Sequence, residues 1–310
     1  MKILHISDIH LENPCGLDDK YILGRFRDFL SSLVSVMPLD LMVITGDLRN
    51  NENNPASVSD IITVITDVAT AAKITDNIHI VPGNHDLTRV GDEKERVGNI
   101  RKKYQYKHGT FSNSGKTLVE ISNRFDDFFW KFCNEFYTRD NPWVNNHLNP
   151  HYSLSVDNNG YIFINSSLTC IDSDSDGNLI IGLSYVSDLI DGIIFNNPNT
   201  ERIMLFAHHP LHNLHNREID TMQSTLRKHS NIIFNWFCGD AHSNKVEESK
   251  GIDIFQGGSL LGASSTIPEF SIYELDDTSL KRRIYRFIPH LNNSVGGWKR
   301  VYPDDHSLTE

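Results

Sequence analysis

Five short clusters of Asp, Asn and His residues hold the side chains of this sequence that could bind a metal ion. Imidazole nitrogens and carboxylate or amide oxygens are the usual protein ligands of divalent cations. Ligands of an open α/β sheet bind outside the carboxyl ends of its strands, so clusters that each follow a predicted strand should converge on one site. The five clusters are Asp8-Ile9-His10, Gly46-Asp47, Gly83-Asn84-His85-Asp86, His208-His209-Pro210 and Gly239-Asp240-Ala241-His242.

The first third of the chain supplies strands and helices in alternation. Apolar runs predict strands at Lys2–Ser7, Asp40–Thr45 and Asn77–Val81. Apolar residues at helical spacing predict helices at about Asp18–Val36 and Ser57–Ala72. This β-α-β-α-β order implies parallel strands joined by right-handed crossovers, which would bring the first three clusters to one edge of a sheet.

The second half of the chain returns to strands after a break. Helices are predicted near Ser184–Phe195 and Ile219–His229. The stretch that begins at Asn292 is polar and is expected to be loose. Strands are predicted at His151–Val156, Tyr161–Leu168, Arg202–Ala207, Asn231–Cys238, Ile252–Gln256, Glu269–Leu275 and Arg282–Ile288.

A polar region between these halves breaks the pattern and is interpreted as an inserted cap at about residues 88–149. The expected organisation is one domain over residues 1–290 with this cap, followed by a polar tail at 291–310. The cap contains an aromatic helix at about Arg124–Tyr137 and a basic run without acidic residues, in which Tyr104 and Tyr106 are interleaved. This run is either a solvated face or a grip on a nucleic-acid backbone. Its cations are Arg101, Lys102, Lys103 and Lys107.

Composition excludes several classes of protein. The 310 residues include 29 Lys and Arg against 40 Asp and Glu, a formal charge of −11, which argues against a global basic field for nucleic acid. No apolar run approaches the length of a membrane span, and no signal peptide is evident at the start. The four cysteines are scattered and form no CxxC pair, so we expect reduced thiols in a cytoplasmic protein.

The ordered clusters resemble the calcineurin-like metallophosphoesterases, whose pattern is DxH, GD, GNH(D/E), His and GHxH. The resemblance covers most of the chain, from Met1 to about Ile288. It implies an α/β fold, a four-layer α/β/β/α sandwich of two mixed β-sheets flanked by helices. It also implies two divalent metal ions about 3.5–4 Å apart, with a hydroxide that bridges them and attacks phosphorus in line.

The family pattern assigns a role to each matching residue. The first metal would take Asp8, His10 and His242, and the second would take Asn84, His208 and Asp240. Asp47 would bridge the two ions. His85 matches the general acid that protonates the leaving alkoxide. His209 and His212 are candidates for lining the phosphate pocket.

Two positions depart from the family pattern. Asp240 stands where the family has a metal-binding His, which shifts the expected preference toward Mn²⁺, with Fe, Zn, Ni and Mg²⁺ as alternatives, or leaves the second metal weakly bound. Asn50 stands where many members have the Asp that orients the catalytic His. Asn50 can accept a hydrogen bond but cannot stabilise an imidazolium by charge, so Asp86 or a neighbouring carboxylate could substitute.

The predicted function is a metal-dependent phosphoesterase that hydrolyses a phosphodiester of a nucleotide or nucleic acid. A phosphomonoesterase on the same metal pair is the enzymatic alternative. A catalytically weak scaffold that uses the fold for binding is the alternative of a different class. The chain could equally be a module of a larger protein or complex.

Overall fold

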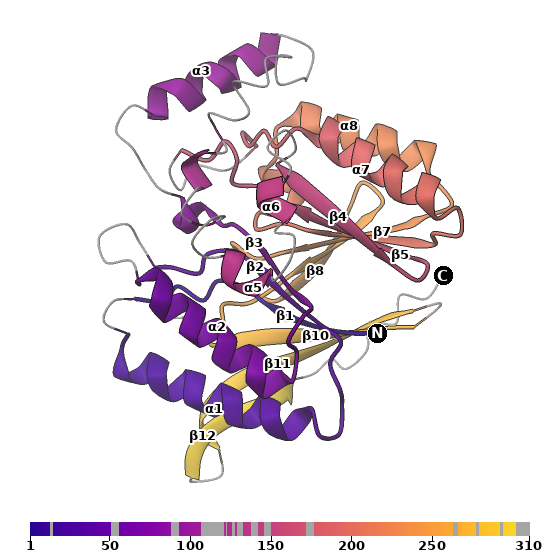
Figure 1. Ribbon diagram of the computed structural model, residues 1–310. Coiled ribbons are helices and arrows are strands. Elements are labelled where there is room, and N and C mark those ends of the chain that lie inside the picture. The colour runs from indigo at the N-terminus through magenta and orange to yellow at the C-terminus, as the bar shows by residue number, and fades with distance from the viewer. Residues whose placement is uncertain are drawn as a thin grey trace. The chain divides into compact units, whose positions relative to one another are not determined.

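A computed structural model divides the chain into two compact units, each with its own mixed β-sheet and flanking helices (Figure 1). The first unit comprises Met1–Ile80, Gly239–Asn244 and Gln256–Glu310, and the second comprises Val81–Cys238 and Lys245–Phe255. No helix among the described residues is long and apolar enough to cross a membrane. The structure describes residues 1–12, 15–50, 56–87, 93–106, 121, 123–125, 128, 133–137, 142–145, 150–171, 177–262, 266–276, 279–291 and 294–301.

The sheet of the first unit has the strand order β12-β11-β10-β1-β2-β3. β1 pairs in parallel with β2, as the predicted crossover requires, and antiparallel with β10, which makes the sheet mixed. The strands are β1 (Lys2–Ile6), β2 (Leu41–Thr45), β3 (Ile78–Val81), β10 (Glu269–Leu275), β11 (Leu280–Leu291) and β12 (Ser294–Val301).

Helices α1 (Leu17–Leu33) and α2 (Val58–Ala72) lie side by side in the first unit (Figure 1). Ser57 accepts a hydrogen bond from the Asp60 amide while the Asp60 carboxylate accepts from the Ser57 amide, so a capping box starts α2. Lys73 in the left-handed conformation ends it. Both helices therefore begin and end close to the positions that sequence periodicity predicts.

The sheet of the second unit has the order β4-β5-β6-β7-β9-β8 and is also mixed. Helices α7 (Leu183–Asn196) and α8 (Asn216–Lys228) pack together, and α7 contacts β4 and β5. The strands are β4 (His151–Val156), β5 (Asn159–Ile164), β6 (Arg202–Phe206), β7 (Ile233–Cys238), β8 (Lys245–Ser249) and β9 (Ile252–Gln256).

An aromatic ladder crosses this second sheet from β4 to β9. Neighbouring rings stack with centroids 4.6–5.4 Å apart, and each ring comes from the next strand in the sheet. Such cross-strand pairs stabilise a sheet in its register, and Phe206 of this series is the last residue of β6, two positions before His208. The ladder consists of Tyr152, Phe163, Phe206, Phe237 and Phe255.

The sequence patterns do not predict two of the strands, β8 and β12. A loose polar stretch was expected from Asn292, but Ser294–Val301 forms β12 and pairs with β11. Trp298 of β12 is buried against Phe26 and Phe270. This packing stabilises a strand whose glycine-rich sequence does not predict it. β8 is a charged strand at the sheet edge, where polar composition is normal.

Part of the proposed cap falls within the described residues. Helix α3 (Glu93–Tyr106) carries the start of the basic run, and α6 (Pro142–Asn145) contacts β4. Of the predicted aromatic helix at Arg124–Tyr137, the described part contains the short helical turns η2 (Asn123–Phe125) and α5 (Asn134–Phe136). The boundaries of the cap, and of a single domain over 1–290, stay predictions.

Candidate metal centre

Two loops of the first unit run side by side where β1 and β2 end. The Asp8 amide donates to the Gly46 carbonyl at 3.1 Å, and the His10 amide donates to the Asp47 carbonyl at 2.9 Å. The parallel pairing of the two strands therefore continues into the loops and brings the first two sequence clusters together. Asp8, His10 and Asp47 are all buried.

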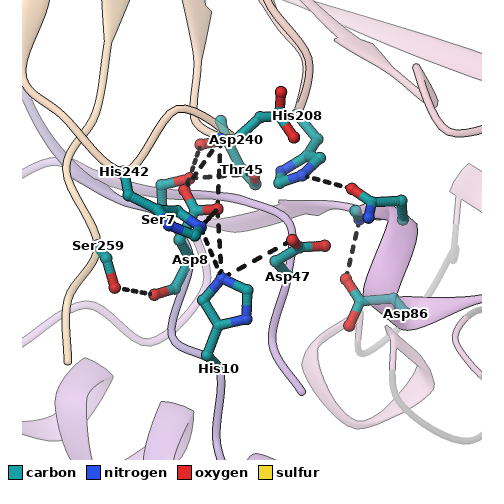
Figure 2. A network of polar contacts seen from close by, with 12 residues as sticks. Ser7, Asp8, His10, Thr45, Asp47, Asp86, His208, Asp240, His242 and Ser259 are labelled. Atoms are coloured by element: carbon teal, nitrogen blue, oxygen red, sulfur yellow. Dashed lines mark hydrogen bonds and ion pairs between the residues drawn. The ribbon is translucent and has the colours of Figure 1, made fainter. Parts of the chain in front are cut away.

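Three side chains of this unit point their ligand atoms toward one another (Figure 2). The Nε2 atoms of His10 and His242 lie 2.9 Å apart. Oδ1 of Asp8 lies 3.7 Å from Nε2 of His10 and 3.4 Å from Nε2 of His242. Oδ2 of Asp47 lies 3.8 Å from the same His10 nitrogen.

This triangle of donor atoms has the dimensions of a divalent metal site. An ion with bonds of about 2.1 Å keeps neighbouring ligand atoms about 3.0–3.4 Å apart in octahedral or tetrahedral geometry. The three separations between Asp8, His10 and His242 bracket that range. The donor set of two imidazoles and one carboxylate therefore fits a divalent cation after shifts of a few tenths of an ångström.

Left-handed backbone is concentrated among the candidate ligands. Among the described residues other than glycine, eight have positive φ angles, and five of them are candidate ligands. Left-handed backbone costs about 1–2 kcal/mol for such residues and persists only where the surrounding structure holds it. These five ligand candidates are Asp8, His10, Asp47, Asp240 and His242.

The loop Gly239–Asn244 completes the candidate ligand group of the first unit. The Asp240 amide donates to both carboxylate oxygens of Asp8, at 3.2 and 3.3 Å. A Cβ atom at Gly239 would lie 1.8 Å from Oγ of Ser7, so only glycine permits this approach. Asn244, which Arg282 and Ser271 bind through its side-chain oxygen, fixes the other end of the loop.

The second unit holds a separate pair of candidate ligands. Oδ1 of Asn84 lies 3.1 Å from Nε2 of His208, which is fully buried. Ser166 orients the loop after β6, because its Oγ accepts hydrogen bonds from the amides of both His208 and His209. An amide oxygen beside an imidazole nitrogen is a donor pair that Mn²⁺ and similar ions accept.

The candidate general acid His85 lies in a single 3₁₀ turn, Asn84–Asp86. Asp86 is buried, and its Oδ2 accepts a hydrogen bond from the Gly83 amide at 2.9 Å. This bond ties Asp86 to the start of the turn that presents His85. Asn50 in the first unit donates its side-chain amide to Glu12.

The residues predicted to bind substrate have different surroundings. His209 is fully buried and contacts Ser166, whereas His212 is exposed in the turn Leu211–Asn213. Arg101 donates from Nε and Nη2 to the Thr169 carbonyl, at 3.1 and 2.7 Å, so its guanidinium holds the main chain. Lys102 is exposed. The Lys103 side chain and Lys107 lie outside the described residues.

Sequence reasoning missed the hydroxyl groups that hold these ligands. Ser7 donates to Oδ2 of Asp8 at 2.5 Å, Ser259 donates to the Asp8 carbonyl at 2.7 Å, and Ser166 binds the His208 loop. One signal could have revealed Ser7: the polar residues His5 and Ser7 alternate with the apolar residues Leu4 and Ile6.

The fold and the candidate ligands are those expected of a metallophosphoesterase, and comparison with known proteins identifies the family. The family model described as calcineurin-like phosphoesterase matches residues 1–255. The chain belongs to this family. Its two mixed sheets with flanking helices confirm the fold class expected from the resemblance, and its donor sets suggest a dimetal site.

Individual relatives are distant. The chain is 32% identical over 114 residues to a probable cyclic nucleotide phosphodiesterase of Fibrobacter succinogenes, covering 34% of this chain and 40% of that protein. It is 24% identical over 185 residues to the metallophosphoesterase-like protein YydB of Bacillus subtilis, covering 57% of this chain and 35% of that protein. The chain thus matches less than half the length of either curated relative.

A solved structure shows the same fold along nearly the whole chain. The dimetal phosphatase of Danio rerio superposes with a TM-score of 0.57 at 12% identity and covers 97% of this chain and 99% of that one.

Proposed function

We propose that this protein is a metal-dependent phosphodiesterase. The observation that carries the proposal is the triangle of Asp8, His10 and His242, whose donor atoms lie 2.9–3.7 Å apart, close to metal-ligand spacing. A phosphodiester is anionic and repels nucleophiles, so its hydrolysis near neutral pH needs cationic help of the kind this triangle can hold.

The second metal of the pair is assigned to Asn84, His208 and Asp240, with Asp47 as the bridging ligand. The contact between Asn84 and His208 supports the first two of these assignments, and the position of Asp47 beside His10 supports the bridge. The oxygen-rich donor set favours Mn²⁺, with Fe, Zn, Ni and Mg²⁺ as alternatives.

The chain's own groups supply the rest of the chemistry. When bound, two divalent cations neutralise phosphate charge and provide a nucleophile from water near neutral pH. His85 holds the proton that the leaving alkoxide needs, and the short turn closed by Asp86 presents its ring. Asn50, which is bonded to Glu12, is assigned no part in orienting His85 in this proposal.

We assign the substrate to the nucleotides rather than to long nucleic acids. The relative described as a cyclic nucleotide phosphodiesterase supports this choice. The basic run of α3 gives little support to nucleic-acid binding, because Arg101 donates two hydrogen bonds to the Thr169 carbonyl. The net charge of −11 also disfavours long polyanions.

Hydrolysis of two nitrophenyl esters tests the proposal. With Mn²⁺, bis-p-nitrophenyl phosphate should be hydrolysed at least tenfold faster than p-nitrophenyl phosphate, and EDTA should abolish both activities. Asp47→Ala should remove activity, while Asp67→Asn, which alters an exposed partner of Arg27, should keep it. A reversed ratio would identify a phosphomonoesterase. Bound metal without hydrolysis of either ester would identify a scaffold.

A further inference from the structure

A chain of polar side chains runs behind Asp8 on one face of the first sheet. His5 pairs with Val43 in the parallel register of β1 and β2, so Ser7 and Thr45, two residues further along each strand, share the face of His5. His5, Ser7 and Thr45 are all at most 1% exposed. Three adjacent polar residues in a buried apolar sheet require hydrogen-bond partners, because an unpaired buried polar group is costly.

The partners form a continuous series that ends on Asp8. Nε2 of His5 lies 2.8 Å from Oγ1 of Thr45, and this hydroxyl donates to Oγ of Ser7 at 2.9 Å. Ser7 in turn donates to Oδ2 of Asp8 at 2.5 Å. Figure 2 shows Ser7 and Thr45 beside the Asp8 carboxylate.

The acceptor at the end of the series fixes its direction. An ionised carboxylate only accepts hydrogen bonds. Oγ of Ser7 lies 2.5 Å from Oδ2 of Asp8 and 3.2 Å from the Thr45 carbonyl, so its one hydrogen is directed to the shorter, charge-assisted bond with Asp8. The Thr45 hydroxyl then donates its hydrogen bond to Ser7, so the Nε2–H of His5 is the donor to Thr45. Burial and the charge of Arg282 lower the pKa of His5 to about 3, which agrees with a neutral ring.

The two oxygens of Asp8 are thereby made different. Only Oδ2 receives the charge-assisted bond from Ser7, whereas the Asp240 amide lies almost equally far from both oxygens, at 3.2 and 3.3 Å. Oδ1 faces the Nε2 atoms of His242 and His10, at 3.4 and 3.7 Å.

We propose that His5, Thr45 and Ser7 are positioning residues that fix the Asp8 carboxylate so that it binds the first metal through Oδ1 alone. This inference rests on the metal site of the proposed function. It adds that the metal affinity of Asp8 depends on hydroxyl groups that do not touch the metal. Groups that orient a ligand in this way typically contribute about 10–100-fold to metal affinity.

The test measures metal binding and not only hydrolysis. Mn²⁺ is titrated into the whole chain, and electron paramagnetic resonance measures the concentration of Mn²⁺ that stays free. Ser7→Ala and Thr45→Val should each weaken the tighter Mn²⁺ site by about 10–100-fold. Thr45→Ser restores the hydroxyl and should return the affinity to within about threefold of wild type. The Co²⁺ visible spectrum should change in Ser7→Ala, because the binding mode of the carboxylate changes.

A matched control separates positioning from loss of a buried hydroxyl. Thr225 is buried in the second unit and bonds to Ser187, so Thr225→Val removes a comparable hydroxyl and should leave Mn²⁺ affinity unchanged. Wild-type affinity in both Ser7→Ala and Thr45→Val would overturn the inference and leave the proposed function standing. Absence of Mn²⁺ binding by the wild-type chain would overturn the proposed function, and the inference with it.

Discussion

His10 and His242, more than two hundred residues apart in the chain, bring their Nε2 atoms to within 2.9 Å of each other. The rings meet edge to face with centroids 4.8 Å apart, so the two nitrogens point at one location instead of stacking. Asp8 faces both rings with one carboxylate oxygen. This relationship underlies the first prediction.

Replacement of one ring should empty the first metal position. We expect His242→Ala to weaken the tighter Mn²⁺ site by at least about 100-fold, since loss of a ligand exceeds the 10–100-fold effect of residues that support ligands. Isothermal titration calorimetry with Mn²⁺ measures the change. His229→Ala removes an imidazole that follows α8 and bonds to Asp191 of α7, so it is the matched control and should keep wild-type affinity. Equal affinities in the two variants would contradict the assignment.

The close approach of Gly239 to β1 gives a second prediction. Gly239→Ala would place a methyl group 1.8 Å from Oγ of Ser7 and 2.3 Å from Oδ2 of Asp8. The strand end must shift, so we expect a loss of about 1–3 kcal/mol in the free energy of unfolding, together with weaker Mn²⁺ binding. Urea denaturation of the metal-free protein measures the first effect.

Gly192 provides the control for that substitution. It lies inside α7, and apart from the chain around it in the helix no atom lies within 4 Å of the position that a Cβ would take, so Gly192→Ala should stabilise the protein by about 0.5–1 kcal/mol. If Gly239→Ala did not lower the free energy of unfolding relative to Gly192→Ala, the close approach of Gly239 to the end of β1 would be contradicted.

Arg101 gives a third prediction. Its guanidinium donates twice to the Thr169 carbonyl, and hydrogen bonds from charged groups contribute about 1.5–3 kcal/mol. We therefore expect Arg101→Ala to lower the free energy of unfolding by about 2 kcal/mol, measured by urea denaturation. Lys102→Ala, at an exposed neighbouring position, should change it by less than about 0.5 kcal/mol. Equal changes in the free energy of unfolding in the two variants would contradict a structural role of Arg101.

The buried histidines predict that acid destabilises the protein well above pH 4. Burial lowers the pKa of His151 to about 4, from 6.5 for an ordinary histidine. The unfolded chain therefore binds a proton that the folded chain excludes, so stability is full above pH 6.5 and falls between pH 6.5 and 4. At pH 5 this one residue should cost about 2 kcal/mol.

His151→Gln removes the titrating ring and keeps a donor for the Ile181 carbonyl that His151 contacts. In the metal-free protein, the difference in unfolding free energy between pH 7.5 and pH 5 should shrink by about 2 kcal/mol in this variant. An unchanged pH dependence would mean that His151 titrates normally in the folded protein.

Cysteine reactivity gives the last prediction. Cys15 is partly exposed, whereas Cys133, Cys170 and Cys238 are buried. Burial and the nearby Asp19 raise the pKa of the Cys15 thiol above 9, so little thiolate is present at neutral pH. Iodoacetamide should add once to the folded protein, with a rate that still rises above pH 9. Mass spectrometry should find no adduct in Cys15→Ser, and a second adduct in the folded wild type would contradict the burial of the others.

Local patterns predicted the strand ends well because each cluster follows a run whose periodicity is readable along the chain. β1, β2 and β3 appear close to their expected limits, and Asp8 and Asp47 meet because parallel neighbours end at the same edge. The capping box at Ser57 is local in the same sense. Such features depend on residues only a few positions apart.

Contacts between distant segments were not predictable in this way. The bond from Thr45 to Ser7 depends on the register between two strands, and the partner of Arg101 is a carbonyl 68 residues away. The basic run was therefore interpreted as either a solvated face or a nucleic-acid contact, and neither alternative predicted that Arg101 binds a main-chain carbonyl. β12 was missed because its burial comes from Phe26 and Phe270, which belong to other segments.

The central position of β1 in its sheet has a consequence for biosynthesis. β1 and β2 are made early, but the other neighbour of β1 is β10, near the far end of the chain. Ribosomes add roughly 5–20 residues per second, so about 10–40 s pass between completion of β3 and arrival of β10. During that interval one edge of β1 has no strand to pair with and is open to other chains. The nascent protein should therefore depend on chaperones until its last strands emerge.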